Sequence, residues 1–385
     1  MGDEWTIFKI MYGFLKKNGG FAGIKRLVLM TLVFLTYANL YSEESPLTLS
    51  IYFDNDLFSD TDRDYTNGTK FSVISPDLPS IASYLDNSDY GVISRRAAKW
   101  LELLGERLDD GYRRLNLFNI SGPSVESQYN IEMTLGQQMY TPDDIFEKDL
   151  ITTDRPYSGW LYIGGSLHRK TENTLETLTV EIGVVGPLSL ARETQDFVHD
   201  DLRSIPTAQG WDHQLKNELG INLLIERKER LFRKEIGVIG IDALCHYGVS
   251  LGNVLTFANF GAELRYGLNL PDDFGEALLG RSGNSNIRGI QANRDEHRDF
   301  LSCYLFTGID GRGVLRNIFL DGNTFEDSHS VDKENWVGDL SMGISWLFNE
   351  KVKISYAQVF RTREYKGQDD EQSYGAINVS THFDF

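Results

Sequence analysis

The sequence predicts an all-β fold, a transmembrane antiparallel β-barrel of about twelve strands. Three observations predict it: a secretory signal near the N-terminus, alternating apolar and polar residues through the rest of the chain, and an aromatic residue, Phe385, that ends the last alternating strand. Apolar residues make up 41% of the 385 residues. They do not form the repeated runs of about 20 residues that helical membrane proteins need. A closed barrel satisfies every backbone hydrogen bond in lipid without such runs.

Residues 25–42 have the three parts of a secretory signal. A basic pair at residues 25–26 precedes a short apolar stretch at residues 27–38, and small and polar residues follow. The stretch is short for a bilayer-spanning helix, and an uncleaved N-terminal anchor is the alternative interpretation. We therefore assign residues 1–42 to an N-terminal extension and signal peptide. Residues 43–385 are expected to form one exported barrel domain.

Period-two alternation marks the strands. Leucine, isoleucine and phenylalanine alternate with Thr, Ser and Tyr at residues 47–53, and residues 376–385 alternate in the same way. The predicted strands number twelve, and single-chain bacterial barrels require an even number. They cover residues 46–54, 68–76, 128–139, 158–169, 175–185, 214–227, 233–248, 253–268, 298–311, 336–348, 350–362 and 373–385.

Strand parity predicts which connections share an end of the barrel. With both chain ends in the periplasm, odd strands rise, even strands descend, and most long polar loops fall at the outer end. Two long periplasmic connections break this division. Between strands 2 and 3, Arg95 to Leu108 predicts an amphipathic helix that lies under the barrel or plugs it. Residues 269–297 are expected to be irregular or mobile.

The charge balance restricts the partners. Acidic residues outnumber basic residues 56 to 38, which gives a formal charge of −18. We therefore expect no nucleic-acid partner, because nucleic-acid affinity comes largely from neutralising phosphates. An acidic surface instead suits divalent cations. The two cysteines, Cys245 and Cys303, make no disulfide framework, and the predicted strands hold them too far apart to pair.

The first outer loop is acidic. It holds five aspartates within eleven residues, from Asp54 to Asp64. Hard oxygen ligands at this density suit Ca²⁺, although a solvated loop without a metal is the alternative. The spacing begins like an EF-hand, but Tyr65 stands where glycine is required and Phe71 stands where the closing glutamate is required. The EF-hand motif is therefore excluded.

The third outer connection contains Gln195 and His199, which share one face if the segment is helical. A neutral imidazole at a wet rim can act as a general base, whereas a surface histidine without a role is the alternative. His329 is the other outer-loop histidine. The chain has no nucleophile elbow, P-loop or zinc-protease motif, so a serine hydrolase is disfavoured. These residues could instead support hydrolysis by water that a histidine activates, with a metal stabilising the oxyanion.

Motifs in a fixed order along the chain carry a family resemblance. They are Asn55-Asp56, TDRDYTNG at 61–68, GQQMYTP at 136–142, DRPYSGW at 154–160, GVVGP at 183–187, Gln195 with His199, GWDHQLKNE at 210–218, GNV at 252–254, RNIFLDG at 316–322 and DSHSVDK at 327–333. Singly each is weak, but together, on an exported barrel, they are specific. The sequence resembles the LpxR family of outer-membrane lipid A 3′-O-deacylases over nearly all of the mature chain.

This resemblance implies a twelve-stranded barrel with Ca²⁺-dependent ester hydrolysis, by a mechanism similar to that of secreted phospholipase A2. It implies that His199 is the general base and that Gln195 positions groups beside it. The metal and oxyanion site would include Asn55 and Asp56. Two further polar positions of the family site correspond to Thr66 and Lys148.

The resemblance also implies the setting. The substrate would be lipid A of lipopolysaccharide, the site would lie at the outer face of the outer membrane, and the barrel assembly machinery would recognise Phe385. We expect a monomer. Asn55 shares the parity of Ile51 and Phe53, so we expect the site on the outer wall, under a loop helix that carries His199. The alternatives are an outer-membrane esterase of phospholipase type and a structural or transport barrel without enzymatic activity.

Overall fold

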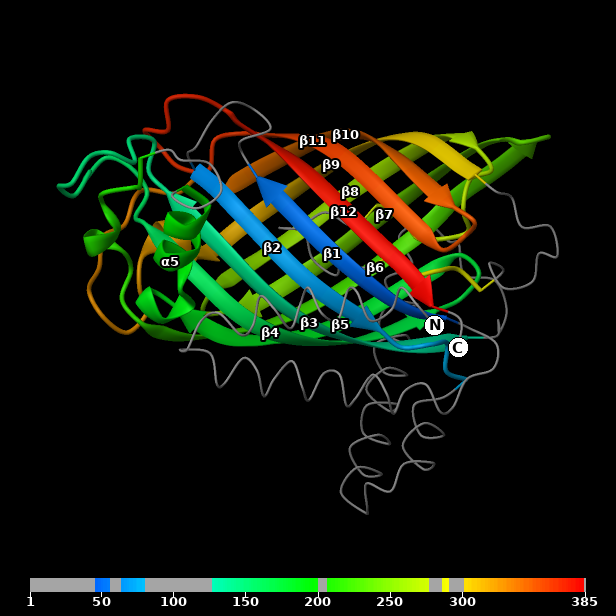
Figure 1. Cartoon of the computed structure of the whole chain (residues 1–385), viewed down its shortest axis with the longest axis horizontal. Coiled ribbons are helices and arrows are strands. Elements are labelled where there is room, and N and C mark those ends of the chain that lie inside the picture. Colours follow the sequence, from blue (N-terminus) through cyan, green and yellow to red (C-terminus); the bar gives the residue numbers. More distant parts are fainter. Residues whose placement is uncertain are drawn as a thin grey trace, which may run out of the picture. The chain divides into compact units, whose positions relative to one another are not determined.

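A closed antiparallel barrel is the central feature of the protein (Figure 1). The structure is a computed structural model that describes residues 46–55, 64–79, 127–199, 206–276, 286–290 and 301–383. Within these ranges each of twelve strands pairs with its neighbours along the chain, and β1 pairs with β12. The strands are β1 (Leu47–Asn55), β2 (Asp64–Ile74), β3 (Gln128–Thr141), β4 (Ser158–Lys170), β5 (Thr174–Val185), β6 (Glu218–Ile236), β7 (Ile239–Gly252), β8 (Leu255–Leu268), β9 (Leu301–Asn317), β10 (Trp336–Phe348), β11 (Val352–Arg361) and β12 (Gln372–Phe383).

The predicted fold and strand number are confirmed. The predicted signal peptide at residues 1–42, the predicted helix from Arg95 to Leu108, and Phe385 lie outside the described residues. Within the described ranges, no helix is both long enough and apolar enough to cross a membrane.

One predicted turn was wrong. The predicted strands 214–227 and 233–248 left residues 228–232 as their connection, but β6 continues to Ile236 and the turn lies at Gly237. Gly237 has a φ of 60°, which glycine adopts without steric cost. The charged residues 226–230 stay in the strand because they pair along it and with the neighbouring strand. Arg227 Nε lies 2.6 Å from Glu229 Oε1 on β6, and Arg227 Nη1 lies 2.6 Å from Glu176 Oε1 on β5.

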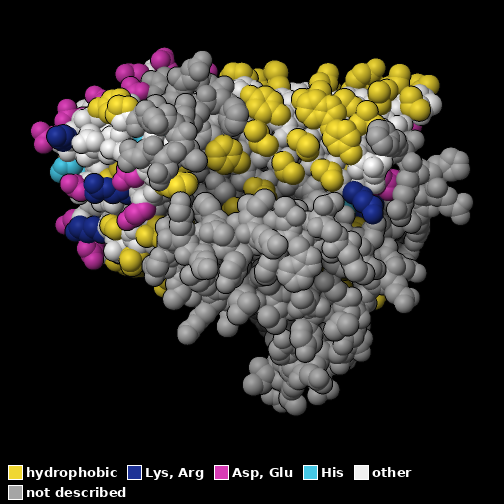
Figure 2. Space-filling model, in the orientation of Figure 1, with side chains coloured by type: hydrophobic (Ala, Val, Ile, Leu, Met, Phe, Trp, Pro, Cys, Tyr) yellow, Lys and Arg dark blue, Asp and Glu magenta, His cyan; other side chains and the backbone are white. Residues whose placement is uncertain are grey.

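Alternate residues of each strand face outward and inward. Ile51, Phe71 and Ile163 are about half exposed on the outside. Inward-facing residues are polar and buried, as in the contact between His168 Nε2 and Glu132 Oε2 at 3.1 Å. Figure 2 shows hydrophobic side chains over the upper part of the barrel wall and most of the charged side chains in view gathered at the left end. This pattern is that of a barrel whose outer wall faces lipid.

Aromatic side chains fill the barrel interior at the end that carries the long loops. The short helix α6 (Ile318–Asp321) follows β9 and folds into this end, where Phe319 stacks on Tyr140 at a centroid distance of 4.3 Å. Trp160 and Tyr162 stack beside them, also at 4.3 Å. These side chains belong to one buried cluster, which also includes Tyr304 of β9 and Leu270 just after β8.

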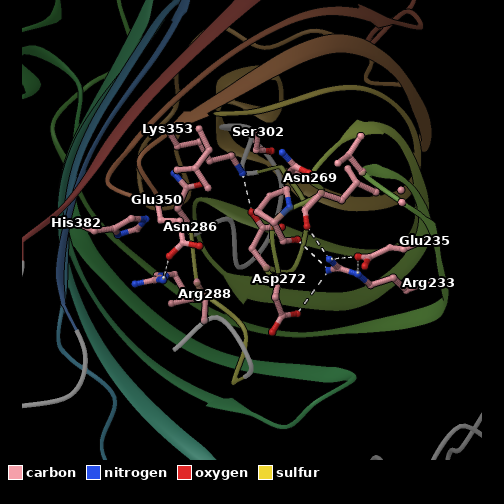
Figure 3. A pocket seen from close by; sticks show the side chains of 18 residues that line it. Arg233, Glu235, Asn269, Asp272, Asn286, Arg288, Ser302, Glu350, Lys353 and His382 are labelled. Atoms are coloured by element: carbon pink, nitrogen blue, oxygen red, sulfur yellow. Dashed lines mark hydrogen bonds and ion pairs between the residues drawn. The ribbon is translucent and has the colours of Figure 1, made fainter. Parts of the chain in front are cut away.

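The connection between β8 and β9 enters the interior from the opposite end. Asp273 contacts two inward-facing cations, Arg265 and Lys353, and its Oδ2 lies 3.0 Å from Lys353 Nζ. Asn286 donates from Nδ2 to Asn378 Oδ1 at 2.7 Å. Figure 3 shows the cavity of about 270 Å³ that remains beside this connection. The described part of the connection is irregular, as predicted, but ion pairs hold it inside the barrel.

Candidate active site

A short helix packs on the outside of the barrel wall. The 3₁₀ turn η2 (Pro187–Ser189) leads into α5 (Ala191–Phe197). Both lie against β3 and β4, where Gln137 Nε2 donates to the Ser189 carbonyl oxygen at 2.7 Å. A Cβ atom at Gly159 would overlap Ser189 and Ala191, so the glycine allows this close approach. Gln137 and Gly159 share the parity of exposed residues of their strands, which places α5 on the lipid-facing side.

His199 follows the end of α5 in a π-helical turn, and only 3% of it is exposed. Its Nδ1 lies 2.9 Å from the carbonyl oxygen of Pro206. Because a carbonyl oxygen can only accept, Nδ1 carries the hydrogen in this contact. In the neutral imidazole, Nε2 is then the basic nitrogen. The fold therefore selects the tautomer that a general base requires.

Gln195 lies one turn before His199, and its side chain is held by Trp211. The 3₁₀ turn η4 (Trp211–His213) places the indole so that Nε1 donates to Gln195 Oε1 at 2.7 Å. Both residues are buried. The other end of the amide, Nε2, is also buried and has no hydrogen-bond partner among the described residues.

A small apolar core joins α5 to two outer segments. Its members are Met139, Ile145, Tyr157, Ala191, Ala208 and Trp211. Backbone bonds add to it: Gln209 N donates to the Ile145 carbonyl oxygen at 2.8 Å. The loop after β3 and the segment before β6 therefore fold over α5 as one unit. Lys148 belongs to that loop, but its side chain is exposed.

Strand register places Asn55 and Thr66 near the same end of the wall. Asn55 pairs with Asn67, Asn67 pairs with Met139, and Met139 pairs with Gly159, which lies under α5. Neighbouring strands are roughly 4.8 Å apart, so Asn55 is about 10 Å from Met139 along this row. Thr66 lies where the β2–β3 register shifts between Tyr65 and Asn67.

The structure thus brings some of the predicted residues together. Gln195 lies on α5, and His199 lies in the turn that follows it. The row of paired residues from Asn55 to Gly159 ends under α5. Asp56 lies outside the described residues. His329, the alternative histidine, donates from Nε2 to the Asp154 carbonyl oxygen at 2.6 Å, so it ties two outer segments together.

Oxygen donors on this wall have the chemistry that Ca²⁺ prefers. Asn55 and Asn67 are paired neighbours, and Asn55 shares the outward parity of Ile51. The described residues contain no group of three His, Cys, Asp or Glu side chains arranged for a metal. Asp56, the predicted carboxylate ligand, directly follows Asn55 in the sequence and lies outside the described residues. The donor set suits a hard cation but stays a prediction.

Arg155 and Tyr157 contact opposite sides of the barrel wall near the site. Arg155 points inward and its Nη2 lies 2.8 Å from Glu364 Oε2. Tyr157 packs on Trp211, with ring centroids 4.9 Å apart. Burial alone would raise the pKa of the Glu364 carboxyl, but nearby guanidinium groups, Arg155 first, outweigh it and hold the pKa below its ordinary value.

Sequence reasoning did not find Trp211 or the Pro206 carbonyl as parts of the site. The one available signal for Trp211 was its place in the GWDHQLKNE motif. A backbone carbonyl leaves no signal in the sequence.

Comparison with known proteins supports the architecture. The sequence model of the family described as outer membrane protein LpxR matches residues 27–383. No curated protein sequence matches the chain. Among solved structures, LpxR from Salmonella typhimurium has 18% sequence identity and a TM-score of 0.64, and the match covers 87% of this chain and 100% of that one. The β domain of the Bordetella autotransporter BrkA has 7% identity and a TM-score of 0.39, with 89% and 100% of the two chains covered.

Proposed function

Because the chain belongs to the LpxR family of outer membrane proteins, we propose that it hydrolyses an ester of lipid A in the outer leaflet. The bond would be the one that attaches the 3′-linked acyl chain. One observation carries the proposal: the buried His199, held in a base-competent tautomer, follows a helix that lies on the lipid-facing side of the barrel wall. An acyl ester in the leaflet can approach that side without entering the barrel.

The proposed chemistry needs one water molecule. Nε2 of His199 takes a proton from water, and the resulting hydroxide forms a bond to the ester carbonyl carbon. The tetrahedral intermediate then collapses, and the bond from carbon to the sugar oxygen breaks. His199 returns its proton to that oxygen. The products are a free fatty acid and a lipid A hydroxyl group, so atoms and charge balance.

The remaining site residues would stabilise the negative charge that develops on the ester oxygen. We propose that Asn55 and Asp56 hold a Ca²⁺ ion. When bound, the ion would stabilise the oxyanion by direct charge attraction. We assign Thr66 and Lys148 as further polar contacts of the substrate or the oxyanion. Gln195 lies next to His199 and is suited to position the reacting ester.

The location and assembly of the enzyme follow from the same proposal. The end that carries α5 would face the cell exterior, where lipopolysaccharide lies. We also propose that the barrel acts as a monomer and that the assembly machinery recognises Phe385.

The filled interior argues against a transport barrel. A buried aromatic cluster lies inside the barrel, and the described part of the β8–β9 connection contacts inward-facing Lys353 through Asp273. Interior packing of this kind supports the outer wall as the working surface. An esterase acting on glycerophospholipids would use the same wall, so substrate analysis must separate the two.

Mass spectrometry tests the proposal. The purified barrel is incubated with lipopolysaccharide and with glycerophospholipid, each with Ca²⁺ or with EDTA. We expect lipid A to lose its 3′-linked chain only with Ca²⁺, while glycerophospholipid stays intact. Release of fatty acid from glycerophospholipid alone would instead support the phospholipase alternative. No release from either lipid would support a barrel without enzymatic activity.

A further inference from the structure

The two ends of the Gln195 amide have opposite surroundings. Oε1 accepts a hydrogen bond from Trp211 Nε1 at 2.7 Å, whereas Nε2 is buried and lacks a hydrogen-bond partner among the described residues. Indole Nε1–H is only a donor, so it can bond only to the amide oxygen. A flipped amide would place its NH₂ group against the indole N–H and lose this bond. Trp211 therefore determines that Nε2 is the end of the amide that can donate to another group.

The indole is itself held in place. Trp211 is 1% exposed and packs with Tyr157, Met139 and Ala191 in the small core under the outer segments. Backbone bonds fix the turn: Gln214 N donates to the Trp211 carbonyl oxygen at 3.2 Å. A fixed indole holds the Gln195 amide in one orientation. A donor that is already oriented costs little reorganisation when charge develops nearby, and this property makes an oxyanion site effective.

A buried NH₂ group without a partner is unfavourable unless something binds it. Gln195 lies four residues before the proposed general base, so the two side chains lie on the same side of the helix. The reacting ester must sit beside that base. Its carbonyl oxygen, which becomes negative during hydrolysis, needs hydrogen-bond donors.

We infer that Trp211 is a positioning residue that turns the Gln195 amide so that Nε2 donates to the carbonyl oxygen of the scissile ester. The inference rests on the proposed hydrolysis and adds a second element to it. The oxyanion would be stabilised by a side-chain N–H as well as by the proposed cation. Trp211 acts only through Gln195 and does not touch the substrate.

Two substitutions separate the roles. Gln195→Glu keeps an oxygen for the indole but replaces the donating NH₂ with an acceptor. Loss of one oxyanion donor typically lowers kcat about 10²–10³-fold, and we expect this loss with little change in KM. Trp211→Phe removes the indole N–H, so the amide is free to flip and kcat falls less, about 10-fold. The double variant should be no slower than Gln195→Glu, because Trp211 works through that amide.

Trp160 provides the matched control. It is equally buried, but its indole Nε1 has no hydrogen-bond partner among the described residues and it faces the barrel interior. Trp160→Phe removes the same atoms, so it should leave kcat within about twofold of the parent value if only packing matters. Heat-dependent migration on gels checks that each variant forms a folded barrel.

The outcomes are distinct. If the parent is active and Trp211→Phe has the same kcat as Trp160→Phe, the positioning role is overturned and the proposed function still stands. Effects of Gln195→Glu and Trp211→Phe that multiply in the double variant would also overturn it. A folded parent that leaves lipid A intact would overturn both the proposed function and this inference.

Discussion

Nδ1 of His199 and the carbonyl oxygen of Pro206 lie 2.9 Å apart, so a backbone group sets the tautomer of the proposed base. A residue seven positions along the chain thus prepares Nε2 to accept a proton.

Replacement of this histidine should stop most of the hydrolysis. Loss of a general base typically costs about 10²–10⁴-fold in rate, and we expect His199→Ala to lose activity in that range while the barrel still inserts. Mass spectrometry of lipid A measures the activity, and gel migration measures folding. The control is His213→Ala, because that histidine is exposed on η4. Full activity of His199→Ala would remove its assignment as the base.

The close approach of α5 to the wall should be required for activity. A side chain at Gly159 would overlap Ser189 and Ala191, so Gly159→Val must displace the helix. Overpacking of this kind costs about 1–3 kcal/mol, and we expect at least a 10-fold loss of deacylation from a barrel that still folds. Gly165→Val is the control, since a Cβ there meets nothing within 4 Å. Equal activity of the two variants would contradict a role for the position of α5.

Removal of Ca²⁺ should abolish deacylation reversibly. We expect EDTA to stop the reaction and Ca²⁺, but not Mg²⁺, to restore it, because Mg²⁺ dehydrates reluctantly and demands stricter geometry. Asp56→Asn should raise the Ca²⁺ concentration for half-maximal rate by about tenfold or more, as a ligand charge is lost. Asp62→Asn, in the same acidic loop, serves as the control. Activity that resists EDTA would exclude the metal.

The Glu364 carboxylate should stabilise the barrel mouth in a pH-dependent way. Its Oε2 lies 2.8 Å from Arg155 Nη2, and the loss of one member of a buried ion pair costs about 3–5 kcal/mol. We expect Glu364→Gln to lower the free energy of unfolding by this amount at pH 7, measured by urea unfolding in detergent.

The sign of the pH effect follows from the pKa of Glu364, which is lower in the folded state. The stabilisation is fully present above the unfolded pKa of about 4.3 and is lost as pH falls through the folded value. The difference between parent and Glu364→Gln should therefore shrink below about pH 4. Glu371→Gln, an exposed position in the same loop, should show no such difference. If the difference in the free energy of unfolding between the parent and Glu364→Gln does not change with pH, the ion-pair explanation is contradicted.

The β8–β9 connection should keep the barrel closed to solutes. Asp273 holds Arg265 and Lys353, and burial, which alone would raise its pKa, is outweighed by Lys353 and Arg265, so the pKa lies far below its usual value. We expect no steady conductance from the parent in planar bilayers and brief openings from Asp273→Ala. Glu235→Gln, at a more exposed ion pair, is the control. Steady conductance from the parent would support the transport alternative.

Strand number and the loop helix were predictable because each depends on local pattern. Alternation identifies a strand wherever one face is apolar, and the spacing of Gln195 and His199 places both on one face once the segment is helical. The β6–β7 turn was mispredicted for the same local reason. Alternation of apolar and polar residues is lost over the charged residues 226–230, and the cross-strand partner of Arg227, Glu176, lies far away in the sequence.

The amino-acid sequence by itself determined the closed antiparallel sheet and the outward parity of Asn55, and it offered His199 as the candidate base. Period-two patterning specifies which face of a strand meets lipid, whatever the rest of the chain does. Only the tertiary structure decided that Trp211 holds Gln195, that Pro206 orients His199 and that Asp273 pairs with Lys353 inside the barrel. Such contacts join backbone carbonyls or side chains whose meeting depends on loop paths, and no periodic pattern encodes a loop path.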